Sequence, residues 1–373
     1  MIKPIAVNNF SLSGNEKKYI NECIDSGWIS SEGPFIEKFE GAFSQYIGRQ
    51  HGIAVSSGSA ALDIAVKVIG IGEGDEVIMP TFTIISPALS VVRSGGIPVL
   101  VDSDPLTWNM DVDQLEAKIT NKTKAVIVVH IYGLPSAMDA ITAIAEKYNL
   151  KIIEDASQMH GQTYKGKKCG SFGDISIFSF YPNKHITTGE GGMILVDDGD
   201  LANKCKKLRN LAFEADGPRF VHHEMGWNYR MTNMQAAVGL AQVEQIDDFI
   251  IKKRAIGKFY NENISHLTKY GFQLPLPKLE YANNIYWVYG LVAPDVTEKI
   301  RLNEHLKTKQ IGFRPFFWCM HEQPVFNKMK LFLGESYPVA ENLARTGTYI
   351  PSGLGLLDEE LKIVSKTISE IYG

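Results

Sequence analysis

The stretch "HGIAVSSGSAALDIAVKVIGI", residues 51–71, passes from a short apolar run through a Ser/Gly turn into a longer apolar segment of helical periodicity. A buried strand followed by a crossover helix is the repeating unit of parallel α/β sheets. The turn would place free backbone N–H groups and the positive end of the helix dipole at one edge of the sheet. The stretch therefore predicts a strand, an anion-binding turn and a helix.

The same alternation continues through the first two thirds of the chain. "DEVIMP" precedes "SPALSVVRSG", "IPVLVD" precedes a polar loop and helix, "KAVIVVHIYG" precedes "MDAITAIAEKYN", and "KIIEDAS" precedes a glycine-rich connection. This pattern predicts a large α/β domain, residues 1–240, built on a doubly wound, mostly parallel sheet. From residue 232 we expect one long amphipathic helix, opened by a Thr cap, that leads into a smaller α+β domain, residues 241–373.

Composition narrows the classes of function. The 373 residues carry a net charge of −4, with no basic stripe, so nucleic acid and anionic membrane are not expected partners. No run approaches the roughly 18 apolar residues that a membrane span needs. The four cysteines have no metal-ligand spacing and are expected to be reduced, and no metal is expected. We expect a cytoplasmic protein that acts on small molecules.

Three features follow strands of the predicted sheet. Lys184 lies just beyond "DISIFSF", Asp155 ends "KIIED", and the turn at 57–59 offers Ser57, Gly58 and Ser59. Each has an ordinary structural interpretation, as a solvated lysine, a turn aspartate and a helix cap. Ligands nevertheless collect at the carboxyl ends of such strands. Together, the amine, the carboxylate and the anion cradle meet the needs of pyridoxal phosphate, and Phe82 is our candidate to stack on its ring.

The whole chain resembles the nucleotide-sugar aminotransferases, which have the aspartate-aminotransferase fold and are fold-type I pyridoxal-phosphate enzymes. The resemblance lies in ordered motifs: "SSGSAAL", "GDEVIMPTFT", "IPVLVDSDP", "TKAVIVVHIYG", "IIEDASQMHG", "SFGDISIFSF" and "GWNYRMTNMQAAVGLAQ". In that family the Schiff-base lysine stands five residues after a serine, which here implies Lys184 after Ser179. The resemblance further implies that Asp155 pairs with the pyridinium and that Gln158 lies near the ring hydroxyl.

The resemblance also assigns the phosphate site and the assembly. Ser179, Gly58 and Ser59 would hold the phosphate, and Asn228 would reach it from the neighbouring subunit, which implies a homodimer with shared active sites. Arg230 has two open interpretations, a phosphate contact or a structural bond within its loop. In the C-terminal part, "FRPFFWCMHEQPVF" resembles a substrate-binding segment, with Arg314 and His321 facing the sugar. A core strand with a fully bonded histidine is the equal alternative.

His185 stands directly after Lys184. Some relatives carry histidine at the lysine position and are sugar dehydratases, but the aligned residue here is Lys184, so we expect His185 to be structural. The glycines at 189, 191 and 192 fit neither a dinucleotide fingerprint nor a P-loop and are expected to permit a tight turn. A dehydratase that uses pyridoxamine phosphate, or a regulator without turnover, is therefore less favoured than an aminotransferase.

The substrate expectation rests on resemblance. "DSGWISSEGPFIEKFE" and "NKHITTGEGGM" are most similar to the branch that uses glutamate to aminate C4 of GDP-4-keto-6-deoxymannose, giving GDP-perosamine, a sugar of O-antigen and surface polysaccharide biosynthesis. Two features depart from that branch: Gln158 stands where it carries Glu, and the lysine loop reads Y-P-N-K rather than F-G-N-K. An aminotransferase for a UDP- or dTDP-linked 3- or 4-keto sugar remains the alternative.

Overall fold

The computed structural model describes residues 4–214 and 217–373, and its centre is a seven-stranded sheet. The strand order is β1-β9-β8-β5-β4-β2-β3, and every pairing is parallel except those of β9, which runs antiparallel to both β1 and β8. This confirms the mostly parallel α/β sheet. The strands are β1 (His51–Val55), β2 (Glu76–Pro80), β3 (Ile97–Val101), β4 (Thr123–Val129), β5 (Lys151–Asp155), β8 (Ile175–Ser179) and β9 (Gly192–Val196).

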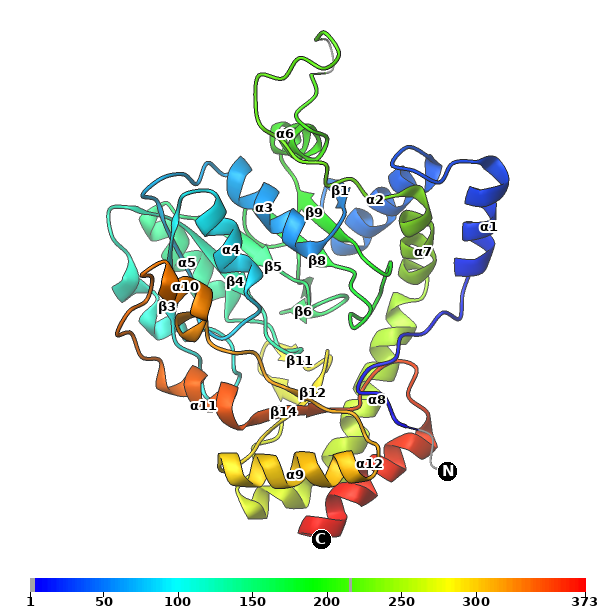
Figure 1. Cartoon of the computed structure of the whole chain (residues 1–373), viewed down its shortest axis with the longest axis vertical. Helices are drawn as coiled ribbons and strands as arrows, with labels where there is room; N and C mark the ends of the chain where they lie inside the picture. The colour runs from blue at the N-terminus through cyan, green and yellow to red at the C-terminus, as the bar shows by residue number, and fades with distance from the viewer. Residues whose placement is uncertain (1–3, 215–216) are drawn as a thin grey trace.

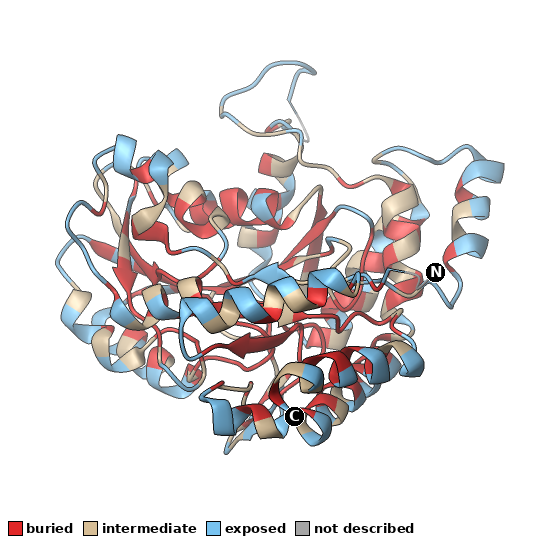
Figure 2. Cartoon of the chain, turned by 60° about the horizontal axis from the view of Figure 1, so that its bottom comes forward, coloured by how far each residue is buried: buried red, intermediate tan, exposed pale blue. Residues whose placement is uncertain are grey.

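Helices cover both faces of this sheet, and each face has its own apolar core. The strands are buried while the outer sides of the helices are exposed (Figure 2). This burial on both faces explains why the strand segments read as nearly continuous apolar runs. One face carries α3 (Gly58–Val68), α4 (Ser86–Arg93) and α6 (Gly199–Arg209), and the other carries α2 (Pro34–Ile47), α5 (Met138–Tyr148) and α7 (Asn233–Val243).

The long helix expected from residue 232 is two helices, α7 and α8 (Ile246–Asn263). Thr232 does cap α7, in a capping box with Gln235. The break falls at Glu244 and Gln245, whose side chains bond the segment before and at the start of α1 (Glu16–Ser26). Polar residues that bond elsewhere interrupt the helix, a feature that periodicity alone does not show.

The C-terminal part forms a third core around a small antiparallel sheet of order β12-β14-β13. Figure 1 shows α8 leading down to this part, where both chain ends lie. Ile5 belongs to the third core, and Phe326 and Tyr337 belong to the core of the large sheet. The division at 240/241 remains a prediction. The elements of this part are β12 (Tyr289–Val292), α9 (Val296–Thr308), β13 (Arg314–Pro315), α10 (Pro324–Lys328), α11 (Pro338–Thr346), β14 (Gly347–Ile350) and α12 (Asp358–Tyr372).

The connection from β3 to β4 has two 3-10 turns, η1 (Val112–Gln114) and η2 (Glu116–Lys118), in place of the expected helix. All four cysteines are free and buried. In the described part of the chain, no helix is long and apolar enough to cross a membrane. The remaining short elements are β6 (Thr163–Tyr164), β7 (Lys167–Lys168), η3 (Ser265–Tyr270), β10 (Lys278–Leu279), β11 (Ala282–Asn283) and η4 (Met320–Glu322).

Candidate active site

A cavity of about 320 Å³ opens at the carboxyl ends of the parallel strands. It brings together residues that follow β1, β5 and β8, which point the same way in the sheet. The predicted site residues that line it are Ser57, Gly58, Ser59, Asp155, Gln158, Ser179 and Lys184. The cavity is completed by Leu62, Ile84, Ser86, Ser157, Tyr181, Asn183, Glu190, Trp287 and Phe317.

The turn from β1 to α3 forms the anion-binding corner. The Ser57 hydroxyl caps α3 by accepting a hydrogen bond from the Ala60 N–H at 3.1 Å. The first N–H groups of a helix have no partner within it, so they remain available to an anion. Gly58 packs against Ser179 so closely that a Cβ would lie 2.8 Å from the serine Cβ. The corner is thus formed where the start of α3 contacts the end of β8.

The glycines after Lys184 shape this corner as well. Gly189 has φ +81°, which confirms a tight turn at that position. Gly192, the first residue of β9, has a different role, because a Cβ there would lie 2.4 Å from the carbonyl oxygen of Ser57. Gly192 therefore permits β9 to approach the anion-binding turn.

Lys184 lies in the loop after β8, with its amine 4.2 Å from the centre of the Trp287 ring. Burial lowers the pKa of this amine to about 8, and the charge of Asp155 opposes that shift. The neutral fraction near neutral pH is therefore larger than that of an exposed lysine, and the neutral amine is the nucleophilic form.

Asp155 ends β5 and is 2% exposed. Burial raises the pKa of its carboxyl, while hydrogen bonds from Ser157 and the charge of Lys184 lower it. Gln158 is oriented by the Tyr132 N–H, which donates to its Oε1 at 2.7 Å. This contact leaves the Gln158 amide nitrogen as a donor for a ligand.

Two buried histidines lie near Lys184. Burial, with the Lys184 charge as a second cause, lowers the pKa of His160 to about 3, and a hydrogen bond with the Ser179 backbone opposes that shift. Burial also lowers the pKa of His185, whose Nε2 contacts the Ile285 carbonyl at 3.5 Å. Both rings are neutral, and His185 is absent from the cavity lining, which fits its expected structural role.

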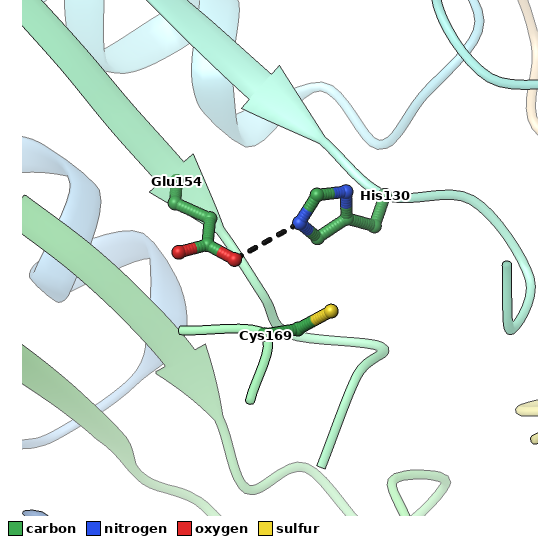
Figure 3. A group of neighbouring side chains, drawn as sticks. All are labelled: His130, Glu154 and Cys169. Carbon is green, nitrogen blue, oxygen red and sulfur yellow. Dashed lines mark hydrogen bonds and ion pairs between the residues drawn. The ribbon is translucent and has the colours of Figure 1, made fainter. Parts of the chain in front are cut away.

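A buried hydrogen-bonded group includes Glu154, the neighbour of Asp155 on β5. His130 Nε2 lies 3.0 Å from the carboxylate of Glu154, and the Cys169 thiol is beside them (Figure 3). His130 Nδ1 accepts from the Ser136 N–H, so Nε2 is the nitrogen that donates. Glu154 also accepts the N–H groups of Gly170 and Phe172 at 2.6 and 2.8 Å. These hydrogen bonds attach the loop after β7 to β5.

Four of the predicted site residues do not line the cavity of this chain: Phe82, Asn228, Arg314 and His321. Phe82 is fully buried, with its ring centre 6.0 Å from that of Phe316 and 6.1 Å from that of Phe317. Asn228 accepts a hydrogen bond from Arg230, which also donates to Asn210, so Arg230 bonds within its own region of the fold.

The two candidate substrate residues differ from each other. Arg314 is exposed, and its guanidinium donates to the Phe313 carbonyl at 3.2 Å. His321 is buried and bonded at both nitrogens, to Thr81 at 2.9 Å and to Glu341 at 3.1 Å. This arrangement favours the alternative of a fully bonded core histidine, because no ring nitrogen is left for a sugar hydroxyl.

Sequence reasoning missed Trp287 and Phe317, which close the cavity from the C-terminal part. Their rings stack at a 6.2 Å centroid distance with 17° between planes. Trp287 lies in "NNIYWVYGLVAP" and Phe317 in "IGFRPFFW", two segments rich in apolar and aromatic residues. A run of aromatic residues in a predicted small-domain strand was the available signal.

The residues present fit pyridoxal phosphate. The cavity offers one amine, one buried carboxylate and the start of a helix, which match an aldehyde, a pyridine nitrogen and a phosphate. These groups follow three different strands, β1, β5 and β8, and the fold of the sheet brings them together in one cavity.

Comparison with known proteins gives one consistent result. The model of the DegT/DnrJ/EryC1/StrS aminotransferase family matches residues 11–369. GDP-perosamine synthase of Escherichia coli O157:H7 is 42% identical over 100% of this chain and 99% of its own, and that of Caulobacter vibrioides is 40% identical over 96% of both chains. The crystal structure of S. venezuelae DesV in complex with a ketimine intermediate matches with a TM-score of 0.88 and 30% identity, covering 96% of this chain and 94% of that one.

Proposed function

The chain belongs to the DegT/DnrJ/EryC1/StrS aminotransferase family, and from this premise we propose that it moves the amino group of glutamate to C4 of a GDP-linked 4-keto-6-deoxy sugar. The enzyme is a pyridoxal-phosphate-dependent aminotransferase of fold-type I. The substrate is inferred from full-length relatives that bear the name GDP-perosamine synthase. The product would serve O-antigen or surface polysaccharide biosynthesis in the cytoplasm.

The convergence of Lys184, Asp155 and the α3 N-terminus in one cavity carries the chemical part of this proposal. When bound, pyridoxal phosphate supplies a carbonyl that bonds to amines and a ring that accepts electrons. Lys184 would provide the neutral amine that holds the cofactor, and the same amine would be placed to take a proton from the donor's α-carbon and return it. Asp155 would keep the ring nitrogen protonated, and the N–H groups at Gly58 and Ser59 would bind the phosphate.

The sugar nucleotide would bind on the C-terminal side of the cavity. Trp287 and Phe317 supply apolar walls there, and the exposed Arg314 is a candidate for the diphosphate, because its planar guanidinium donates in pairs. We do not propose that His321 binds the sugar, because its two ring nitrogens already contact Thr81 and Glu341. Its proposed role is structural.

We expect the amino product to form chiefly from the GDP-linked substrate when the purified enzyme is offered glutamate with GDP-, UDP- or dTDP-linked 4-keto-6-deoxy sugars. The measurement is mass spectrometry of the products, with a reaction lacking glutamate as the control. A clear preference for UDP or dTDP would move the assignment to the alternative sugar nucleotides. No amino product from any of the three would contradict the sugar assignment as a whole.

We further propose that the active enzyme is a homodimer in which Asn228 completes the site of the other subunit. Asn228 does not line the cavity of its own chain, which agrees with such a role. Two-fold symmetry would then give two equal sites. Sedimentation at assay concentration should show a dimer.

Subunit mixing tests the sharing directly. Lys184→Ala and Asn228→Asp should each be inactive, whereas mixed dimers should recover about a quarter of wild-type activity, since half of the dimers carry one intact site of two. Lys184→Ala mixed with Asp155→Asn is the matched control and should recover nothing, because both residues belong to the same chain's cavity. No recovery in the mixture of Lys184→Ala and Asn228→Asp, or an active monomer, would contradict the shared site. Recovery in the control would contradict the placement of Lys184 and Asp155 in the cavity of one chain.

A further inference from the structure

Lys253, on α8, is a buried lysine outside the cavity lining. It is 2% exposed, and its ammonium donates to the carbonyl of Trp287 at 3.0 Å and to that of Ser352. Within residues 4–214 and 217–373, no carboxylate forms an ion pair with it. Burial lowers the pKa of this amine to about 7. Burying an amine is costly, so the two carbonyls are the contacts that offset its lost hydration.

Trp287 connects this lysine to the cavity. Its carbonyl is held by Lys253, and its indole N–H donates to the carbonyl of Asn183 at 2.7 Å. The ring between these two anchors lies 4.2 Å from the Lys184 amine. Stacking against Phe317 restricts the remaining freedom of the ring. Trp287 is therefore fixed at its backbone, at its indole nitrogen and on its face.

The same bonds tie separate segments of the chain around the lysine loop. The Asn183 carbonyl also accepts from Asn8 at 3.0 Å, and the Ser352 N–H donates to the Val7 carbonyl at 3.2 Å. Lys253 thus joins α8, the segment before β12 and the segment after β14 at one point. A movement of any of these segments would therefore also move Trp287.

We propose that Lys253 is a positioning residue that acts on Lys184 through Trp287. The inference rests on the proposed role of Lys184 as the lysine that bonds the cofactor. Trp287 sets where the amine lies and favours its charged form through the ring face, and Lys253 sets where Trp287 lies. Removing the ammonium would free two carbonyls and let the indole move.

The test compares Lys253→Met, Trp287→Phe and the double variant in the holoenzyme. The readouts are the pH midpoint of the visible absorbance band that borohydride bleaches, and kcat and KM for glutamate. Both single variants should move the midpoint by about half a pH unit in the same direction, and kcat should fall about ten- to hundredfold with KM nearly constant. The double variant should add little to Trp287→Phe, because one residue acts through the other.

Lys299 provides a matched control. It is a partly buried lysine on α9 that donates to the Ala344 and Arg345 carbonyls and is absent from the cavity lining. Lys299→Met should leave the midpoint unchanged. If Lys253→Met does not fold, Lys253→Gln keeps an uncharged NH2 group that can still donate to a carbonyl, and it should show a smaller shift of the same sign.

The outcomes separate this inference from the proposed function. A wild-type enzyme without the borohydride-sensitive band contradicts the role of Lys184 and, with it, this inference. A normal wild-type band with additive effects in the double variant, or with an unchanged midpoint in Lys253→Met, contradicts the positioning role alone. A shift of equal size in Lys299→Met does the same.

Discussion

Lys184→Ala is expected to lose amino transfer by about 10⁴-fold or more and to lose the visible band that borohydride bleaches. Lys184 is the only lysine among the cavity-lining residues in the described part of the chain. No neighbouring amine can therefore take over its two tasks, and the two histidines behind it are neutral and bonded or enclosed elsewhere. The variant should still fold. Among the described residues, the Lys184 amine contacts the Trp287 ring and makes no side-chain hydrogen bond.

The measurement is turnover with glutamate together with the absorbance spectrum before and after borohydride. Lys362→Ala, at an exposed lysine on α12 that pairs with Glu359, is the control and should match wild type. In the wild-type apoenzyme, the rate of cofactor attachment should rise with pH through about 8, because only the neutral amine attacks. Comparable turnover in Lys184→Ala would show that another residue holds the cofactor.

Sequence reasoning located the part of the site that lies at strand ends. Asp155, Ser179 and the turn at Ser57 follow apolar runs directly, and parallel strands bring such positions to one edge. The amine, the carboxylate and the anion-binding turn indicated the cofactor, and the order of motifs along the chain indicated the family. These features are local or ordered in one dimension, so they can be read from a single sequence.

Contacts between distant segments could not be read in this way. Trp287 reaches a lysine loop about a hundred residues earlier, and its approach depends on how the C-terminal part docks. His321 could equally have faced a sugar, and only the packing of Thr81 and Glu341 shows that both nitrogens are used. The helix break at Glu244 has the same origin, since its side chain bonds Asn15 far away in sequence.

Asp155→Asn is expected to lower catalytic activity without lowering the stability of the fold. Burial raises the pKa of this carboxyl, so keeping the carboxylate ionised in the folded chain costs stability that an uncharged side chain would not cost. Asparagine has the same shape and can still accept the Ser157 N–H bond that Asp155 accepts at 3.0 Å. Asp155→Asn should therefore fold with an unchanged or raised Tm.

Catalysis should nevertheless fall in Asp155→Asn, by about 10²–10³-fold in kcat, because an amide cannot hold the proton on a pyridine nitrogen as an anion does. The phosphate corner and Lys184 remain, so the cofactor should stay bound and its band should remain sensitive to borohydride. Asp174→Asn is the matched control: that carboxylate accepts the Ile152 N–H and pairs with Lys151 outside the cavity, so it should affect stability without affecting the spectrum. The measurement combines kcat, Tm and the spectrum for both variants. Near wild-type kcat in Asp155→Asn with cofactor bound would rule out the pairing of Asp155 with the ring nitrogen, since the charge is the one property that this substitution removes.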